Sequence, residues 1–307
     1  MKTLTKEDIL TIERQMYNKA RDMDVAILNS LTEESSKEFV LDCLMMYMNR
    51  DGGFGNGLYI DSYNPNSSVY QTYEALRILD MLNFSSDCSL ELFEEITNKA
   101  GNYLFNRCPL VDGAWNPTVK TNDDFAHSEE FNYYENFIPF WGYHPTAAIL
   151  GFCLTLFKPT KAYYKKALKQ LGYVFSYLET KDDFSYNEFI SFNSLLGSLR
   201  KANVFKEEAE IIENKLKLAA KKHIHEPHFS APSFLSNCQK LDPELQQAVE
   251  EKLDEIIDKR ASHGLWEKET GWGSTRYPEA DSAMLKWLGA KTVEVLALLE
   301  GYGRIER

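Results

Sequence analysis

The sequence predicts a soluble all-α protein, on three observations. Apolar residues recur at steps of three and four along most of the 307 residues, which is the spacing of one face of an α-helix. No stretch alternates β-branched with polar residues for long, so we expect no strand. Turns that combine glycine with an aromatic residue return between the helical stretches, most clearly within 51–57.

The segment 51–61 is the one around which the chain is organised. Its first seven residues, Asp51-Gly52-Gly53-Phe54-Gly55-Asn56-Gly57, include four glycines. Glycine tolerates positive φ and lets other groups approach the backbone closely. We therefore expect a compact turn with Phe54 wedged between helices. Asn64-Pro65 then starts the next helix, because proline fits the first helical turn.

Four helices are expected before residue 110, namely 6–29, 32–49, 67–82 and 90–106. The first places its apolar residues on one face: Ile9, Ile12, Met16, Ala20, Met23 and Ile27. Thr32 is a suitable N-cap for the second. A second glycine–aromatic connection follows the fourth, as Asp112-Gly113-Ala114-Trp115, and the region 115–144 is the least regular part of the chain.

The second half is predicted to hold helices 146–157, 160–180, 188–202, 206–222, 242–260 and one from 279 to the end. The stretch 146–157 is apolar on nearly every side, which is typical of a buried helix, so we place it on an inner wall. The stretch 206–222 carries charge pairs four residues apart, as a solvated face does. Alternation of apolar and charged helices, with connections every 40–70 residues, indicates stacked helical pairs. Since no linker stands out, we expect one domain, 1–307.

Composition narrows the function. A formal net charge of −12 disfavours a nucleic-acid partner, which needs a basic face. The N-terminus lacks the apolar stretch of a signal peptide, and the longest apolar run, 146–157, is too short for an integral membrane segment. Five scattered cysteines without a Cys-x-x-Cys pair indicate neither a disulfide framework nor a cysteine zinc site. We therefore expect a soluble, cytoplasmic protein.

The glycine turn also carries a resemblance. Asp51-Gly52-Gly53-Phe54-Gly55 resembles the turn motif of the α/α-toroid proteins related to terpenoid cyclases and protein prenyltransferase β subunits, and the longer run 53–72 is similar to uncharacterised bacterial proteins of that group. Asp112-Gly113-Ala114-Trp115 and His263-Gly264-Leu265-Trp266 resemble degenerate copies. The resemblance implies an α/α toroid, a barrel of paired inner and outer helices around a central cavity open at one end.

The chemistry of those families is not carried over. The Asp-x-Asp-Asp acid motif, the Asp-x-Cys zinc pair and the Asp-Asp-x-x-Asp magnesium motif are all absent from the sequence. The leading hypothesis is a toroid that binds or transforms a hydrophobic, isoprenoid-type ligand in an aromatic, acidic cavity, as a cyclase or transferase if it is an enzyme. The alternatives are a carbohydrate-active toroid that cleaves a glycosidic bond between paired carboxylates such as Asp61 and Asp124, and a degenerate toroid that binds partners. No cofactor is indicated.

The first candidate site is the region 115–144, because long irregular segments in compact domains are often functional. General acids or bases are expected among Asp123, Asp124 and His127, with Asp61 from the glycine turn. Aromatic rings for a cation or a sugar face, with one imidazole, come from the same region: Trp115, Tyr133, Trp141, Tyr143 and His144. The alternative is a surface loop with solvated acids and core aromatics.

Three further groups are candidates. Asn56 lies beside a helix start where backbone N–H groups meet anions, although it also suits a left-handed turn. A wall opposite Trp115 is expected from Trp266, Trp272, Arg276, Tyr277 and Asp281, although helix-end packing explains both tryptophans. His223, His225 and His228 have a spacing that places imidazoles around a transition metal, although a polar loop explains them equally well.

Overall fold

The computed structural model describes residues 1–32, 37–269, 271–272 and 277–306, and it is mostly helical. Helix accounts for 62% of the structure, in thirteen α-helices within the described part of the chain. The all-α prediction is thereby confirmed. None of the described helices combines the length and the apolar character needed to cross a membrane.

The first half differs from expectation at one helix. The predicted helix 6–29 is two helices, because Ala20 adopts an extended conformation that ends the first. The helices of this half are α1 (Lys6–Lys19), α2 (Asp22–Thr32), α3 (Lys37–Met45), α4 (Val69–Met81) and α5 (Glu91–Arg107). The start of the predicted helix at Thr32 is wrong, since α2 runs through Thr32.

A short hairpin corrects the expectation of no strand. Strands β1 (Leu110–Val111) and β2 (Ala114–Trp115) pair in an antiparallel manner. Asp112 and Gly113 both have positive φ, the conformation of the two-residue turn that matches strand twist. The irregular region that follows contains two 3₁₀ segments, Lys120–Asp124 and Glu129–Phe131, and the short helix α6 (Ile138–Trp141).

The second half follows the predicted pattern, with α11 as an addition. Its helices are α7 (Thr146–Leu156), α8 (Ala162–Glu179), α9 (Tyr186–Ala202), α10 (Lys206–His223), α11 (Ala231–Leu235), α12 (Pro243–Asp258) and α13 (Glu279–Gly301). Every residue of α7 is buried, as expected for an inner element. The charged face predicted for α10 is solvated, and the residues buried on its other side are Ala209, Ile212, Glu213, Leu216, Ala219 and Ala220.

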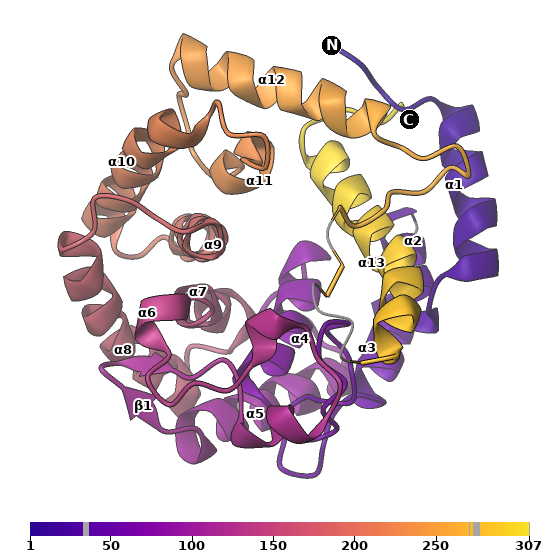
Figure 1. Cartoon of the computed structure of the whole chain (residues 1–307). Helices are drawn as coiled ribbons and strands as arrows, with labels where there is room; N and C mark the ends of the chain where they lie inside the picture. The colour runs from indigo at the N-terminus through magenta and orange to yellow at the C-terminus, as the bar shows by residue number, and fades with distance from the viewer. Residues whose placement is uncertain (33–36, 270, 273–276, 307) are drawn as a thin grey trace.

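The helices follow one another round a circle in Figure 1, in which α12, α10 and α8 lie further out than α11, α9 and α7. Packing contacts agree with this order: α7 packs on α4, α8 and α9, α9 on α10 and α11, and α11 on α12. The two chain ends meet α12. Leu4 pairs with Ile305, and the buried Arg304 binds Asp254 of α12 at 2.7 Å and the Lys2 carbonyl at 2.6 Å.

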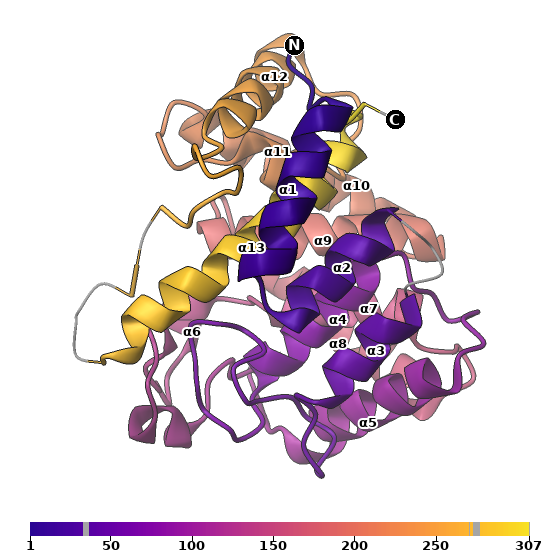
Figure 2. The ribbon, with the colours of Figure 1, turned by 90° about the vertical axis from the view of Figure 1, so that its right-hand side faces the viewer.

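Connecting segments gather on one side of the molecule. Helix α6 and the connection that leads into α13 face the viewer in Figure 1 and lie at the left in Figure 2, which is turned by 90°. The glycine turn reaches this region from α3. Its Phe54 is fully buried, and the Phe54 backbone N–H donates to the Thr72 hydroxyl of α4 at 3.1 Å. Phe54 is therefore part of the main hydrophobic core and is held next to α4.

The turn depends on glycines without a Cβ. A Cβ on Gly55 would lie 2.5 Å from the Pro65 carbonyl oxygen, and one on Gly53 would lie 2.6 Å from the Ser67 Cβ. Both distances are shorter than real side chains accept, and the obstacles belong to the same folded turn. Asp51 fastens the turn by accepting from the Gly53 N–H at 3.0 Å and the Ser67 hydroxyl at 2.7 Å.

We expect Gly55→Ala to lower the free energy of unfolding by about 1–3 kcal/mol, because the new methyl group overpacks a rigid turn. Urea titration followed by circular dichroism measures the change. Gly172→Ala is the matched control: no heavy atom lies within 4 Å of its Cβ position in α8. Alanine there should raise stability by about 0.5–1 kcal/mol, as it does in helix interiors. Equal effects of the two substitutions would contradict the argument.

Candidate functional site

Asp61 is the centre of a buried polar cluster. Only 2% of its surface is exposed, and its two carboxylate oxygens accept from three donors. The indole N–H groups of Trp272 and Trp287 donate to Oδ1 at 2.8 and 2.6 Å, and the Lys268 ammonium pairs with Oδ2. We call these four residues the Asp61 clamp. It ties the glycine-turn segment to the connection before α13 and to α13 itself.

Gln71 of α4 holds the Asp61 segment in place. Its side-chain oxygen accepts from the Tyr59 N–H at 2.7 Å, and its amide group donates to the carbonyls of Tyr59 and Ser62 at 3.2 and 3.0 Å. Three bonds from one buried side chain fix both the entry and the exit of residues 59–62. The position of Asp61 therefore follows from α4, which begins eight residues after it.

The predicted region 115–144 reaches the same place through His127. Ser62 and His127 form an antiparallel bridge, and the Ser128 N–H donates to the Asp61 carbonyl at 2.9 Å. Both ring nitrogens of His127 have partners, the Phe125 carbonyl at 2.7 Å and the Asn132 side-chain oxygen at 2.9 Å. The His127 ring also lies against Tyr277. His127 therefore has a structural role, because it holds the irregular region against the Asp61 segment.

Aromatic rings continue inward from the clamp. Tyr59 contacts Trp287 and Tyr70, with ring centroids 5.5 and 4.7 Å apart. Tyr70 in turn contacts Trp141 and His144, each at 5.5 Å. We call the connected set the aromatic wall; its members are Tyr59, Tyr70, Tyr73, Phe131, Trp141, His144 and Trp287. Rings from the glycine-turn segment, α4, the irregular region, α6, the start of α7 and α13 meet there.

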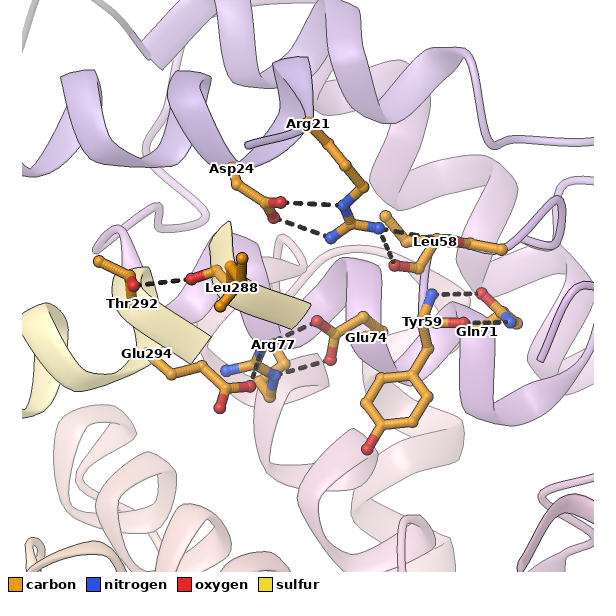
Figure 3. A network of polar contacts seen from close by, with 11 residues as sticks. Arg21, Asp24, Leu58, Tyr59, Gln71, Glu74, Arg77, Leu288, Thr292 and Glu294 are labelled. Atoms are coloured by element: carbon orange, nitrogen blue, oxygen red, sulfur yellow. Dashed lines mark hydrogen bonds and ion pairs between the residues drawn. The ribbon is translucent and has the colours of Figure 1, made fainter. Parts of the chain in front are cut away.

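A charged group lies beside the wall on α4. Arg77 binds Glu74 through two bonds of 2.7 Å and reaches Glu294 of α13 at 3.3 Å, as Figure 3 shows. Arg77 and Glu294 keep 24% and 29% of their side-chain surface exposed, although both belong to helices at the centre of Figure 1. Tyr70, Tyr73, Glu74 and Arg77 follow at i, i+3, i+4 and i+7, so one face of α4 carries rings and charges together.

His144 is the buried titratable group of the wall. Burial lowers its pKa to about 3, so the imidazole is neutral at physiological pH. Its Nδ1 lies 2.7 Å from the Ser191 hydroxyl, and its ring stacks on Trp141. Its Nε2 has no hydrogen-bond partner among the described residues. A neutral imidazole with one free nitrogen suits hydrogen bonding to a neutral group.

The nominated acids of the irregular region lie elsewhere. Asp123 and Asp124 are exposed on the first 3₁₀ segment, and Asp123 accepts only the Tyr133 N–H, at 3.3 Å. Asp61 is buried, but its oxygens are occupied by donors, so it is placed as an acceptor. Asp281 is exposed in the first turn of α13.

The nominated aromatic residues divide into two groups. Trp141, His144 and Trp272 belong to the wall or the clamp. Trp115 packs on Phe105, Tyr143 stacks on Tyr177, and the Trp266 indole donates to the Ile256 carbonyl at 2.6 Å, so these three serve helix-end packing. Arg276 lies outside the described residues.

Two nominations lie away from the wall. Asn56 has positive φ at the tip of the glycine turn and lines a separate surface pocket. His223 bonds Asp183 and Glu226 at 2.8 Å each, whereas His225 is exposed and His228 lies 3.4 Å from Glu269. In the described ranges no three His, Cys, Asp or Glu side chains are grouped to hold a metal.

Sequence reasoning missed most of the wall, including Tyr59, Tyr70 and Trp287, and the charges beside it, Glu74, Arg77 and Glu294. It read α4 only through the apolar face that carries Val69, Tyr73, Leu76, Leu79 and Leu82. The signal was present in the spacing Tyr70-x-x-Tyr73-Glu74-x-x-Arg77, which adds a second face, with rings and charges, to a helix that is buried nearly all round.

Comparison with protein-family models, with curated proteins and with solved structures finds no match for this chain.

We expect Asp61→Asn to lower the free energy of unfolding by about 2–3 kcal/mol, because an amide NH2 donor replaces one acceptor oxygen and the negative charge that pairs with Lys268 is lost. The loss is below that of a fully buried ion pair, since Lys268 keeps 23% of its surface exposed. Chemical denaturation measures it, and the indole N–H resonances of Trp272 and Trp287 should shift. Asp258→Asn, which breaks an exposed pair with Lys2, is the control and should cost less than about 0.5 kcal/mol.

The His223 contacts predict a pH-dependent difference. Desolvation lowers the pKa of His223, but hydrogen bonds to Glu226 and Asp183 outweigh it and raise the pKa above its ordinary value. Protonated His223 therefore stabilises the fold fully below about pH 6.5 and loses this effect as pH rises through the raised pKa. The stability advantage of wild type over His223→Gln should shrink between about pH 6 and pH 9 in thermal unfolding. An advantage that grows with pH would contradict the assignment.

Proposed function

We propose that the chain is an α/α toroid of the terpenoid-cyclase and prenyltransferase type, and that it binds a small, largely hydrophobic ligand against the aromatic wall. Support for the toroid comes from the glycine–aromatic turns and from the circular succession of outer and inner helices in Figure 1. The chain ends meeting at α12 are consistent with a closed ring. The wall then faces the inside of that ring.

The observation that carries the proposal is the composition of the wall. Three parts of the chain that are far apart in sequence, 59–73, 131–144 and Trp287, contribute rings to one connected set. Aromatic rings provide large apolar contact area with few rotatable bonds, so they bind a hydrocarbon at a low entropic cost. The tyrosines and His144 add hydroxyl and imidazole groups that orient a ligand with a polar end.

The charged side chains beside the wall determine which polar group the ligand can carry. Arg77 is neutralised by Glu74 and Glu294, and these two carboxylates disfavour an anionic head group such as a diphosphate. A neutral hydroxyl suits the site, because it donates to a carboxylate and accepts from the guanidinium. The ligand class is therefore an isoprenoid-type body with a hydroxyl group.

Binding is favoured over acid-initiated cyclisation. Asp123 and Asp124 are exposed, and the Asp61 oxygens are engaged by Trp272, Trp287 and Lys268. A general acid needs a free path to its substrate. The Asp61 carboxylate has none, because both of its oxygens are engaged, and Asp123 and Asp124 make no contact with the wall among the described side-chain contacts.

A carbohydrate ligand is the second candidate, favoured by one observation. Glu74 and Glu294 come from different helices and approach the same Arg77 nitrogen, at 2.7 and 3.3 Å. Closely spaced carboxylates are the catalytic groups of most glycosidase active sites, and here they lie beside aromatic rings. Both carboxylates are bound to the same guanidinium, however, whereas a glycosidase needs one of the pair free to donate a proton.

We expect the C15 alcohol farnesol to bind the purified protein and quench its tryptophan fluorescence, whereas maltose does not. Glu294→Gln should weaken farnesol binding about tenfold, the loss of about 1.4 kcal/mol expected for one charge-assisted hydrogen bond. Glu255→Gln on α12, which breaks outer pairs with Lys252 and Lys259, is the control and should leave binding unchanged. Preferential binding of maltose would favour the carbohydrate candidate, and binding of neither would contradict the ligand proposal.

A further inference from the structure

A pocket separate from the aromatic wall opens beside the glycine turn. Its volume is about 440 Å³, within the range of small-molecule sites. Three segments contribute to it: the α1–α2 junction, the end of α3 and the tip of the glycine turn. The lining includes Ala20, Asp22, Met23, Met46, Tyr47 and Asn56.

The floor of the pocket is rigid. Arg21, which also lines it, binds the buried Asp24 through two bonds of 2.9 and 2.8 Å, as Figure 3 shows. The same guanidinium donates to the carbonyls of Leu58 and Gly57 at 3.1 and 3.4 Å. Its charge is thereby neutralised and its position set by both α2 and the glycine turn, so the pocket is largely pre-formed.

Two polar side chains of the lining remain available. Asp22 is exposed and Tyr47 is half-buried, and both residues line the pocket. Neither makes a side-chain hydrogen bond or ion pair within the described parts of the chain, in contrast to Arg21. An uncompensated carboxylate near a half-buried phenol ring is a receptor for positive charge, because the ring face is electronegative.

The electrostatic field in the pocket has the same sign. Burial raises the pKa of the Cys43 thiol, which also lines the pocket, and the charges of Asp22 and Asp42 add to this effect. Burial likewise raises the pKa of Tyr47, opposed by Arg21 and reinforced by Asp24 and Asp22. Burial therefore disfavours a negative charge on either group, and the Asp22 carboxylate, which acts on both, is the feature of the lining that favours a cation.

Apart from Asn56, whose amide donates to Asn49, the remaining lining is apolar and adaptable. Met46 is 78% exposed, and with Met23 and Ala20 it offers polarisable surface to an alkyl chain. We propose that this pocket binds a small organic ammonium ion, with the cationic nitrogen between the Asp22 carboxylate and the Tyr47 ring and its alkyl part against Met46 and Met23. The site is independent of the ligand proposed for the aromatic wall.

The test uses the full chain with two cations and one neutral probe. Choline and n-butylammonium represent methylated and primary ammonium ions, and 3,3-dimethylbutan-1-ol is the uncharged isostere of choline. Isothermal titration should give saturable binding of at least one cation and at least tenfold weaker binding of the alcohol. Methyl-labelled methionine NMR should show shifts at Met46 and Met23, which places the ligand in this pocket.

Two variants decide the assignment. Asp22→Asn should weaken cation binding about tenfold, and Tyr47→Leu should weaken it through loss of the ring, with an unchanged unfolding transition as evidence of folding. Glu294→Gln, at the aromatic wall, is the matched control and should leave cation binding unchanged. Absence of saturable binding by both cations, equal binding of the neutral alcohol, or full affinity in Asp22→Asn would each overturn the proposal.

Discussion

The close backbone packing of the glycine turn is the constraint on which the site depends. The places that a Cβ would take on Gly53 and Gly55 are already occupied by residues 65–67 of the same turn. The segment therefore folds back on itself at van der Waals contact. This brings Phe54 into the core and delivers residues 59–62 to α4, where Gln71 binds them. Asp61 and Tyr59 are placed together by one tight turn, and both the clamp and the aromatic wall begin there.

Buried charge gives the interior its specificity. Asp61, Asp24 and Arg304 are nearly inaccessible, and each has at least two charged or N–H partners. Desolvating such groups costs several kcal/mol unless the geometry of their partners is good. Alternative packings of the same helices would leave one of these charges unpaired. The pairs therefore contribute more to the specificity of this arrangement than to its net stability.

The two candidate binding regions differ in how they treat positive charge. At the aromatic wall, Arg77 is held between two glutamates and a neutral ligand is favoured. At the surface pocket, the charge of Arg21 is neutralised by Asp24. The Asp22 carboxylate then determines that a positively charged ligand is favoured. In both regions the arginine side chain is held in one position and orients the groups around it. Its planar guanidinium can do so because it donates hydrogen bonds to several acceptors in one geometry.

The sequence by itself determined the helical class, nearly all of the longer helices, the buried position of α7 and the importance of the glycine turn, because periodicity and turn chemistry are local properties. It also pointed to Asp61, Trp141, His144 and Trp272 as site residues. Only the tertiary structure decided which side chains meet. The Asp61 clamp joins positions 207 and 226 residues apart, and Arg77 reaches Glu294 across 217 residues. No local pattern encodes such pairings, since they arise when distant helices pack and buried charges find their partners.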